Sequence, residues 1–176
     1  MALVKPVIFQ VVGYQNSGKT SVITKLIHAL KENGINTVTI KHHGHGGKPE
    51  VTAEKDSSKH LTAGAIASIV EGDGRLVLQA DHFVDNLEDQ IKLMDFFQPD
   101  VILIEGHKEK NYPKLLLIKG KKDLQLLKVA TNVKMIMYWD DAGRDYLQQK
   151  TDIPSFNISN DEAINWLVQT LSKFSS

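Results

Sequence analysis

Residues 13–20 read Gly-Tyr-Gln-Asn-Ser-Gly-Lys-Thr and fit the pattern G-x-x-x-x-G-K-[ST]. A β-branched run at residues 7–12 precedes them, and residues 18–33 follow with apolar side chains at helical spacing. The order predicts a strand, a glycine-rich loop and a helix. Gly13 and Gly18 allow the tight turn, so that successive backbone N–H groups point at phosphate oxygens beside the helix N-terminus.

The side chains of this loop predict a nucleoside triphosphate with Mg²⁺ as the ligand. Lys19 supplies a positive charge for the β- and γ-phosphates, and the Thr20 hydroxyl is the expected Mg²⁺ ligand. The predicted nucleotide-binding residues are Gly13, Tyr14, Gln15, Asn16, Ser17, Gly18, Lys19, Thr20 and Ser21. No Asn-Lys-x-Asp motif follows, so the residues by themselves leave the choice between guanine and adenine open.

A carboxylate is expected beside the metal, and two acids flank the apolar run at residues 101–104. Asp100 precedes this run and Glu105 follows it. Ligands of parallel sheets gather at the carboxyl ends of the strands, which favours Glu105. Glu105 could hold Mg²⁺ or orient an attacking water, and a plain surface hydrogen bond is the alternative. We therefore predict Lys19, Thr20 and Glu105 as catalytic residues, with Thr20 and Glu105 at the metal.

The pattern outward from the loop predicts an α/β fold. Residues 35–40 form a second strand, which completes a strand–helix–strand unit and implies a parallel sheet. Further helices are predicted over 55–63, 86–97 and 161–174, and strands over 66–70, 76–79, 101–104, 115–118, 124–127 and 133–137. The turn at 71–74 predicts an antiparallel hairpin. We expect one domain over 1–176: a P-loop NTPase-like, mainly parallel sheet flanked by helices, with this additional hairpin.

Composition narrows the function classes. The 176 residues carry 21 Lys plus Arg against 21 Asp plus Glu and no Cys. A neutral chain gives no general attraction to nucleic acid or to an anionic membrane, and no apolar run approaches the ~20 residues of a spanning helix. Without Cys there are no disulfides, thiolate metal sites or thiol nucleophiles, which favours a reducing compartment. We expect a cytoplasmic protein that binds neither nucleic acid nor membrane.

Two further segments could contact a ligand. Lys41-His42-His43-Gly44-His45 follows the second strand and could chelate a metal, contact an anion or remain solvated. Asp56 either caps the next helix or contacts the ligand. The segment between residues 106 and 134 contains eight Lys, among them Lys108, and two acidic residues. This strip could receive an acidic partner or a phosphorylated ligand, or serve only solubility.

The order of these segments resembles a known family. The segments are Ser17-Gly18-Lys19-Thr20, Lys41-His42-His43-Gly44-His45, Lys55-Asp56-Ser57 with His60, Ala63-Gly64-Ala65, Ile104-Glu105-Gly106-His107-Lys108, Pro113-Lys114, and the stretch from Ile153-Pro154 to Asn160-Asp161. Together they resemble the molybdopterin-guanine dinucleotide biosynthesis protein B (MobB) family. Two positions depart from its pattern: His107 stands where an aromatic residue is expected, and Leu116 where an acid is expected.

The resemblance implies a dimeric P-loop GTP-binding protein with weak GTPase activity. Proteins of this kind act beside the MobA guanylyltransferase, which joins GMP from GTP to molybdopterin. The implied ligands and partners are GTP, Mg²⁺, the MobA-type enzyme, other molybdenum cofactor proteins and molybdopterin. By position, Lys41, His42, His45, Asp56, Lys108 and Glu105 would line the remaining site or contact the partner.

Two other functions remain open from the residues. A metal-delivery GTPase would use His42, His43 and His45, although the chain has no Cys to help bind metal. An ATP-dependent small-molecule kinase would use Glu105 or a residue of the His segment to position an acceptor hydroxyl. The residues by themselves do not decide whether the chain acts as an enzyme or as a weakly hydrolysing accessory protein.

Overall fold

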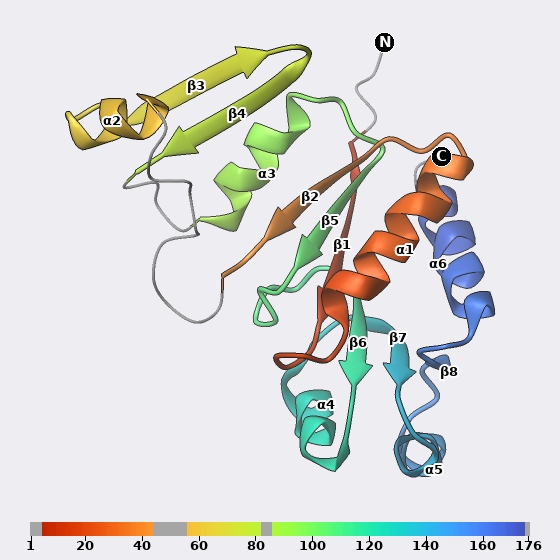
Figure 1. The fold of residues 1–176 in the computed structure, drawn as a ribbon. Coiled ribbons are helices and arrows are strands. Elements are labelled where there is room, and N and C mark those ends of the chain that lie inside the picture. Colours follow the sequence, from red (N-terminus) through yellow and green to blue (C-terminus); the bar gives the residue numbers. More distant parts are fainter. Residues whose placement is uncertain (1–4, 44–55, 82–85, 175–176) are drawn as a thin grey trace. The chain divides into compact units, whose positions relative to one another are not determined.

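The computed structural model describes residues 5–43, 56–81 and 86–174 (Figure 1). The chain divides into two compact units. One comprises residues 1–44 with 88–176, and the other residues 45–87. The expectation of a single domain stays a prediction. None of the described helices combines the length and the apolar character that crossing a membrane requires.

The larger unit contains a six-stranded sheet with the order β2-β5-β1-β6-β7-β8, and every neighbouring pair is parallel. Its strands are β1 (Val7–Val12), β2 (Thr37–Lys41), β5 (Val101–Glu105), β6 (Lys114–Ile118), β7 (Val133–Tyr138) and β8 (Ser155–Asn157). Its helices are α1 (Lys19–Glu32), α3 (Leu87–Asp95), η1 (Lys121–Gln125), α4 (Leu126–Val129), α5 (Asp141–Lys150) and α6 (Asp161–Phe174). The predicted fold class is confirmed.

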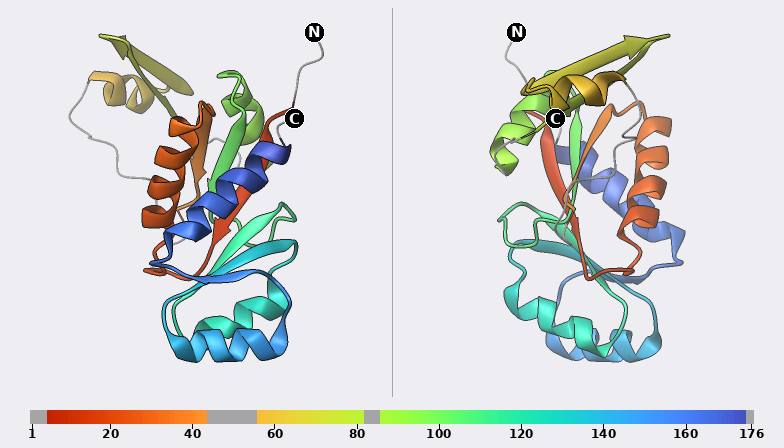
Figure 2. Two further views of the ribbon diagram at one scale, coloured as in Figure 1. Left: turned by 90° about the vertical axis from the view of Figure 1, so that its right-hand side faces the viewer. Right: turned by 60° about the vertical axis from the view of Figure 1, so that its left-hand side comes forward.

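Two hydrophobic cores hold helices against opposite faces of this sheet. On one face Leu26 of α1 and Leu167 of α6 pack with Phe9, and α1 and α6 lie side by side (Figure 2). On the other face Leu126 of α4 and Leu147 of α5 pack with side chains of β6 and β7. Burial of each such Leu contributes roughly 1.5–3 kcal/mol. The central strands are therefore covered on both sides, and their carboxyl ends form a fixed edge.

The smaller unit contains α2 (Asp56–Thr62) and the hairpin of β3 (Ala67–Gly72) with β4 (Arg75–Ala80). The strands pair antiparallel, as predicted, with Gly72 opposite Arg75. Asp73 and Gly74 have φ values of 50° and 74°. Two consecutive residues with positive φ form the tight turn that matches the twist of a two-stranded ribbon.

The strand predicted at residues 124–127 is wrong. The chain there forms the short helices η1 and α4. Asp123 fixes the first turn, because its Oδ2 accepts hydrogen bonds from the backbone N–H groups of Lys119 at 2.7 Å and Gly120 at 3.3 Å. Leu124 and Leu127 are three residues apart and so pack on the same core as a helical pair. The short apolar run belongs to a helix, which periodicity over four residues cannot distinguish from a strand.

Two elements have no counterpart in the predicted order. Helix α5 has few apolar side chains and is capped by Asp140, whose Oδ1 accepts from the Gly143 N–H at 2.8 Å. Strand β8 has only three residues. Three residues are too few to show a strand pattern, and β8 is defined by its parallel pairing with β7.

Candidate nucleotide site at the carboxyl edge of the sheet

The parallel strands end at one edge, and the candidate residues follow these ends. The loop at 13–18 follows β1, Lys41 ends β2 and Glu105 ends β5. In the strand register Glu105 lies opposite both Val11 and Lys41. Because side chains alternate between the two faces of a strand, paired residues in parallel neighbours share a face. The topology thus brings together residues that are as far apart in the chain as Val11 and Glu105.

Two glycines allow the loop to close tightly. Gly18 has φ +94°, and a Cβ there would lie 3.1 Å from Ile158 Cδ1 and 3.2 Å from Trp139 Cζ2. A Cβ on Gly13 would lie 2.5 Å from Ser17 Oγ and 3.1 Å from Leu117 Cβ. Any larger side chain would push the loop away from its neighbours.

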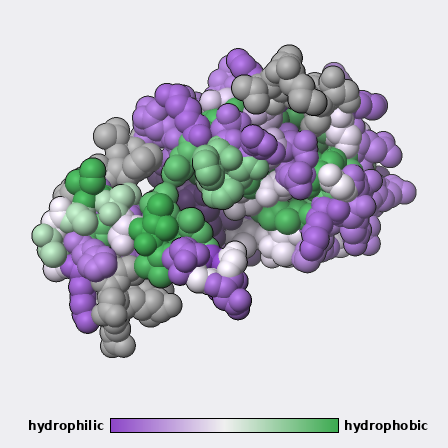
Figure 3. Space-filling view, turned by 90° about the horizontal axis from the view of Figure 1, so that it is seen from above, coloured by the Kyte–Doolittle hydropathy of each residue, from purple (hydrophilic) through white to green (hydrophobic). Residues whose placement is uncertain are grey.

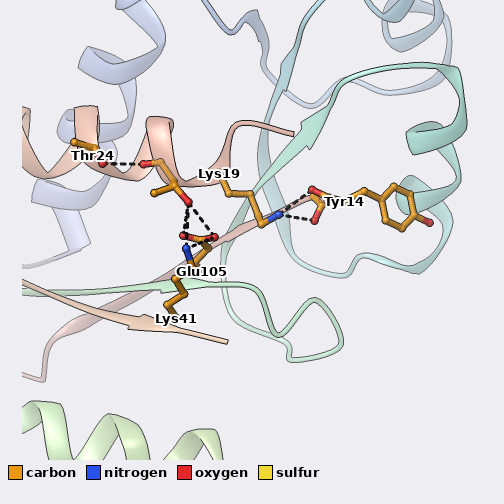
Figure 4. A network of polar contacts seen from close by, with 7 residues as sticks. Tyr14, Lys19, Thr24, Lys41 and Glu105 are labelled. Atoms are coloured by element: carbon orange, nitrogen blue, oxygen red, sulfur yellow. Dashed lines mark hydrogen bonds and ion pairs between the residues drawn. The ribbon is translucent and has the colours of Figure 1, made fainter. Parts of the chain in front are cut away.

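Lys19, the first residue of α1, folds its side chain back over the loop at 13–18. Its Nζ donates hydrogen bonds to the carbonyl oxygens of Tyr14 at 2.8 Å and Gly13 at 3.2 Å (Figure 4). Burial lowers the pKa of Lys19 below its usual 10.5; the Glu105 carboxylate acts against this shift and the Lys41 ammonium adds to it. A neighbouring anion stabilises the charged form of a partly desolvated ammonium, and a phosphate would be such an anion.

Thr20 and Glu105 are in direct contact. The Thr20 Oγ1 lies 3.1 Å from Glu105 Oε2 and 3.3 Å from Oε1, and the hydroxyl donates to the carboxylate. Lys41 joins them: its Nζ is 3.4 Å from Thr20 Oγ1 and 3.5 Å from Glu105 Oε1 (Figure 4). A hydroxyl and a carboxylate are the hard oxygen donors that Mg²⁺ prefers, so this donor set fits that cation.

Asp100, the other acid considered, lies at the opposite end of β5. Its Oδ2 accepts a hydrogen bond from the Asn36 N–H at 2.7 Å. It joins the turn before β2 to the start of β5 and is remote from the loop at 13–18 along the strand direction.

Gln10, a buried residue of β1, supports the turn after Glu105. Its Nε2 donates to the carbonyl oxygens of Gly106 at 3.1 Å and His107 at 2.8 Å. Gly106 has φ +100°, and a Cβ there would lie 3.1 Å from His42 Cβ. The amide of Gln10 thereby orients the chain that follows the carboxylate. In the sequence Gln10 is only a polar residue within an apolar strand, and that anomaly is the signal that could have identified it.

Trp139 is a second residue that the sequence patterns did not reveal. It follows β7, and its Nε1 donates to the Ser17 carbonyl oxygen at 3.0 Å. Lys119, which follows β6, donates to the Asn16 carbonyl oxygen at 3.1 Å and lies 5.3 Å from the centre of the Trp139 ring. Both residues stand directly after parallel strands, at the same edge of the sheet where Glu105 ends β5. Extending the strand-end argument to β6 and β7 would have found them.

The remaining predicted residues lie around this centre or outside the described chain. Lys108 Nζ is 5.7 Å from the centre of the Tyr14 ring, and the Tyr14 hydroxyl accepts from Gln125 Nε2 at 2.8 Å. Gln15 and Ser21 are exposed. His45 lies outside the described residues, and only the backbone of Asp56, at the start of α2, is described.

The two positions that depart from the family pattern are accommodated differently. The His107 ring packs against the His42 ring, with 4.4 Å between their centres. Leu116 is fully buried in the core on the α4 side of the sheet, where an uncompensated carboxylate would be costly. Within the described part of the chain, no group of three or more His, Cys, Asp or Glu residues is arranged to hold a metal ion.

The similarity to known proteins extends beyond the loop at residues 13–18. A family model described as "MobB: Molybdopterin guanine dinucleotide synthesis protein B" matches residues 8–139. A Bacillus subtilis protein named "Probable molybdopterin-guanine dinucleotide biosynthesis adapter protein" is 38% identical over 173 residues, which cover 97% of each chain.

Solved structures agree with this sequence similarity. The crystal structure of Bacillus subtilis MobB matches with a TM-score of 0.79 and 35% identity, covering 93% of this chain and 96% of that one. The structure of a MobB protein homologue from Bacillus stearothermophilus matches with a TM-score of 0.75 and 29% identity, covering 94% and 98%. The similarity therefore spans both compact units and not the phosphate-loop motif alone.

Proposed function

The chain belongs to the molybdopterin guanine dinucleotide synthesis protein B family, and from this we propose that it is an adapter in molybdopterin-guanine dinucleotide biosynthesis that binds GTP with Mg²⁺. Its GTP hydrolysis would be slow. Its partner would be the MobA-type guanylyltransferase, with other molybdenum cofactor proteins and molybdopterin as further candidates.

One observation carries the nucleotide part of this proposal: Lys19 and the Thr20–Glu105 pair adjoin the same loop. Lys19 is held at the carbonyl oxygens of residues 13 and 14, and the Thr20 hydroxyl reaches the Glu105 carboxylate at 3.1 Å. Lys19 would exchange its carbonyl partners for phosphate oxygens, while the backbone N–H groups after Gly13 cradle the phosphates.

Thr20 and Glu105 would hold Mg²⁺, directly or through water. The bound metal would neutralise charge on the β- and γ-phosphates. Only Arg75 and Arg144 are arginines, which leaves few candidates for an arginine that stabilises the transition state from within the chain. Slow hydrolysis follows from this shortage and suits a protein whose nucleotide is used by a partner.

We expect calorimetry with Mg²⁺ to show a preference for GTP over ATP, with both nucleotides titrated into the same protein. Binding of GTP together with micromolar binding of the guanylyltransferase would support the adapter role. Equal binding of ATP, with turnover that rises on adding a small-molecule acceptor, would favour the kinase instead. Stoichiometric Ni²⁺ or Zn²⁺ retention that is lost on changing the His segment to Ala would favour metal delivery.

The exposed hairpin supports the proposed homodimer. Ile69, Leu76 and Leu78 share one face of the hairpin and Val70 and Val77 the other, and these side chains are between 41% and 60% exposed. Green hydrophobic side chains reach the molecular surface in the space-filling view of Figure 3. A two-stranded ribbon cannot bury apolar side chains on both of its faces by itself. A second copy of the chain would cover them.

We therefore expect Leu78→Glu to weaken dimerisation at least tenfold, because it places a charge in the proposed interface. Light scattering after gel filtration, over a dilution series, measures the change. Val129→Glu is the matched control, since Val129 is also exposed (58%) but lies on α4 of the larger unit. A wild-type chain that stays monomeric throughout the series would contradict the dimer.

A further inference from the structure

Lys41 contacts both groups that the proposed function assigns to Mg²⁺. It ends β2 directly opposite Glu105 in the strand register. Its Nζ is 3.5 Å from Glu105 Oε1 and 3.4 Å from Thr20 Oγ1. The ammonium therefore lies beside the same carboxylate and hydroxyl that form the oxygen donor set (Figure 4).

An ammonium and a divalent cation compete for these oxygens. Lys41 lies beside Glu105 Oε1 and Thr20 Oγ1, whose lone pairs Mg²⁺ would also need in its octahedral shell. The two cations also repel one another at such a distance. A metal that takes up Glu105 and Thr20 therefore favours the departure of Lys41 from them.

The geometry makes that departure easy. The Lys41 side chain is 62% exposed, whereas the Glu105 side chain is 12% exposed. An ion pair with one exposed partner contributes little, and the flexible stem of a lysine can rotate without disturbing the core. Glu105 is fixed at the end of a buried strand, so the movable member of the pair is Lys41.

The charges around Lys41 indicate where it would move. Lys41 pairs with the Glu105 carboxylate, and the same carboxylate acts electrostatically to raise the pKa of Lys19. With the carboxylate engaged by a metal, two ammonium groups would face the bound triphosphate. Lys19, at the start of α1, would contact the β- and γ-phosphates in the proposed function, whereas Lys41 approaches from β2, on the other side of β5 from the loop that follows β1.

Resting on the proposed function, we propose that Lys41 exchanges anions when a Mg²⁺–nucleoside triphosphate binds: it leaves Glu105 and Thr20 and pairs with the terminal phosphate. Without nucleotide it serves as the counter-ion of Glu105. With a nucleoside diphosphate it has no phosphate to reach. Lys41 would therefore discriminate the triphosphate from the diphosphate.

Lys41→Met tests this exchange with two measurements. Nucleotide-free protein is titrated with Mn²⁺ as the probe, followed by electron paramagnetic resonance, and the GTPγS and GDP affinities are measured by calorimetry with Mg²⁺. We expect Mn²⁺ to bind about threefold more tightly or better, because its competitor is gone. We expect the preference for GTPγS over GDP to fall about tenfold, the usual scale for one charge-assisted contact, with GDP affinity nearly unchanged.

Two variants complete the design. Lys41→Arg keeps the charge and should retain most of the preference for GTPγS. Lys31→Met removes an exposed lysine from the last turn of α1 and should change neither measurement. If Lys41 only stabilises the local structure, Lys41→Met would weaken both nucleotides alike and leave Mn²⁺ binding unchanged or weaker, which overturns the exchange. Failure of the wild-type protein to bind GTPγS would instead overturn the proposed function and the exchange with it.

Discussion

Lys19→Ala is expected to weaken Mg²⁺–GTP binding by about 100-fold, equivalent to ~2.7 kcal/mol. Partial burial of the Lys19 ammonium lowers its pKa, and its Nζ donates hydrogen bonds to carbonyl oxygens at 2.8 and 3.2 Å. Its interaction with phosphate oxygens replaces two neutral acceptors by charged ones, which strengthens each bond. Calorimetric titration of GTP into the wild type and the variant measures the loss.

Lys25→Ala is the matched control for this change. Lys25 lies on the same helix, and its side chain is 56% exposed and 4.0 Å from Asp161. Its loss should leave GTP affinity within about twofold, because an exposed pair at that distance contributes little. If the two variants bound GTP equally well, Lys19 would not be a phosphate ligand.

Glu105→Gln is expected to reduce GTP hydrolysis by about 10- to 100-fold while leaving GTP affinity within about threefold. The amide has the same shape and can still accept the hydrogen bond from Thr20, now at 3.1 Å, but it lacks the charge that metal or water placement needs. Single-turnover release of phosphate gives the rate, and calorimetry on the same preparation gives the affinity.

Glu109→Gln serves as the control, because Glu109 is an exposed acid in the segment that follows β5. It should leave both the rate and the affinity unchanged. Equal losses of affinity in Glu105→Gln and Lys19→Ala would contradict the division of the site into a binding lysine and a placement carboxylate. The pair of experiments thus separates ground-state binding from the chemical step.

The local sequence accounts for the phosphate loop and the strands that carry the site. A pattern of two glycines, a lysine and a threonine between a β-branched run and an amphipathic helix has one favourable backbone path. The apolar run at 101–104 is buried on both sides, as a central parallel strand requires. The hairpin and the main strands follow from the pattern of apolar side chains and from turn residues, and both of these signals act over a few positions.

Short or weakly apolar elements were beyond such local reasoning. The run at 124–127 has the composition of a strand, yet it is helical, because Asp123 accepts two backbone N–H groups and Leu126 reaches the core on the α4 side. Strand β8 exists through pairing with β7. The core packing of Leu126 and the pairing of β8 with β7 are long-range contacts, and such contacts override weak local preferences.

The sequence alone predicted the position of the loop, of Lys19 after it and of the acid at the end of β5, because motif spacing and strand polarity are local properties with direct geometric consequences. The contacts of Gln10 with residues 106 and 107, of Trp139 with Ser17, and of Lys41 with Glu105 arise from strand order. Residues 41 and 105 become neighbours only when β2 pairs with β5, and residue 139 meets the loop only when β7 takes its place beyond β6. Such proximity results from packing of the whole sheet. The packing energy is a sum over many side chains that are distant in the sequence, so no single segment determines which residues become neighbours.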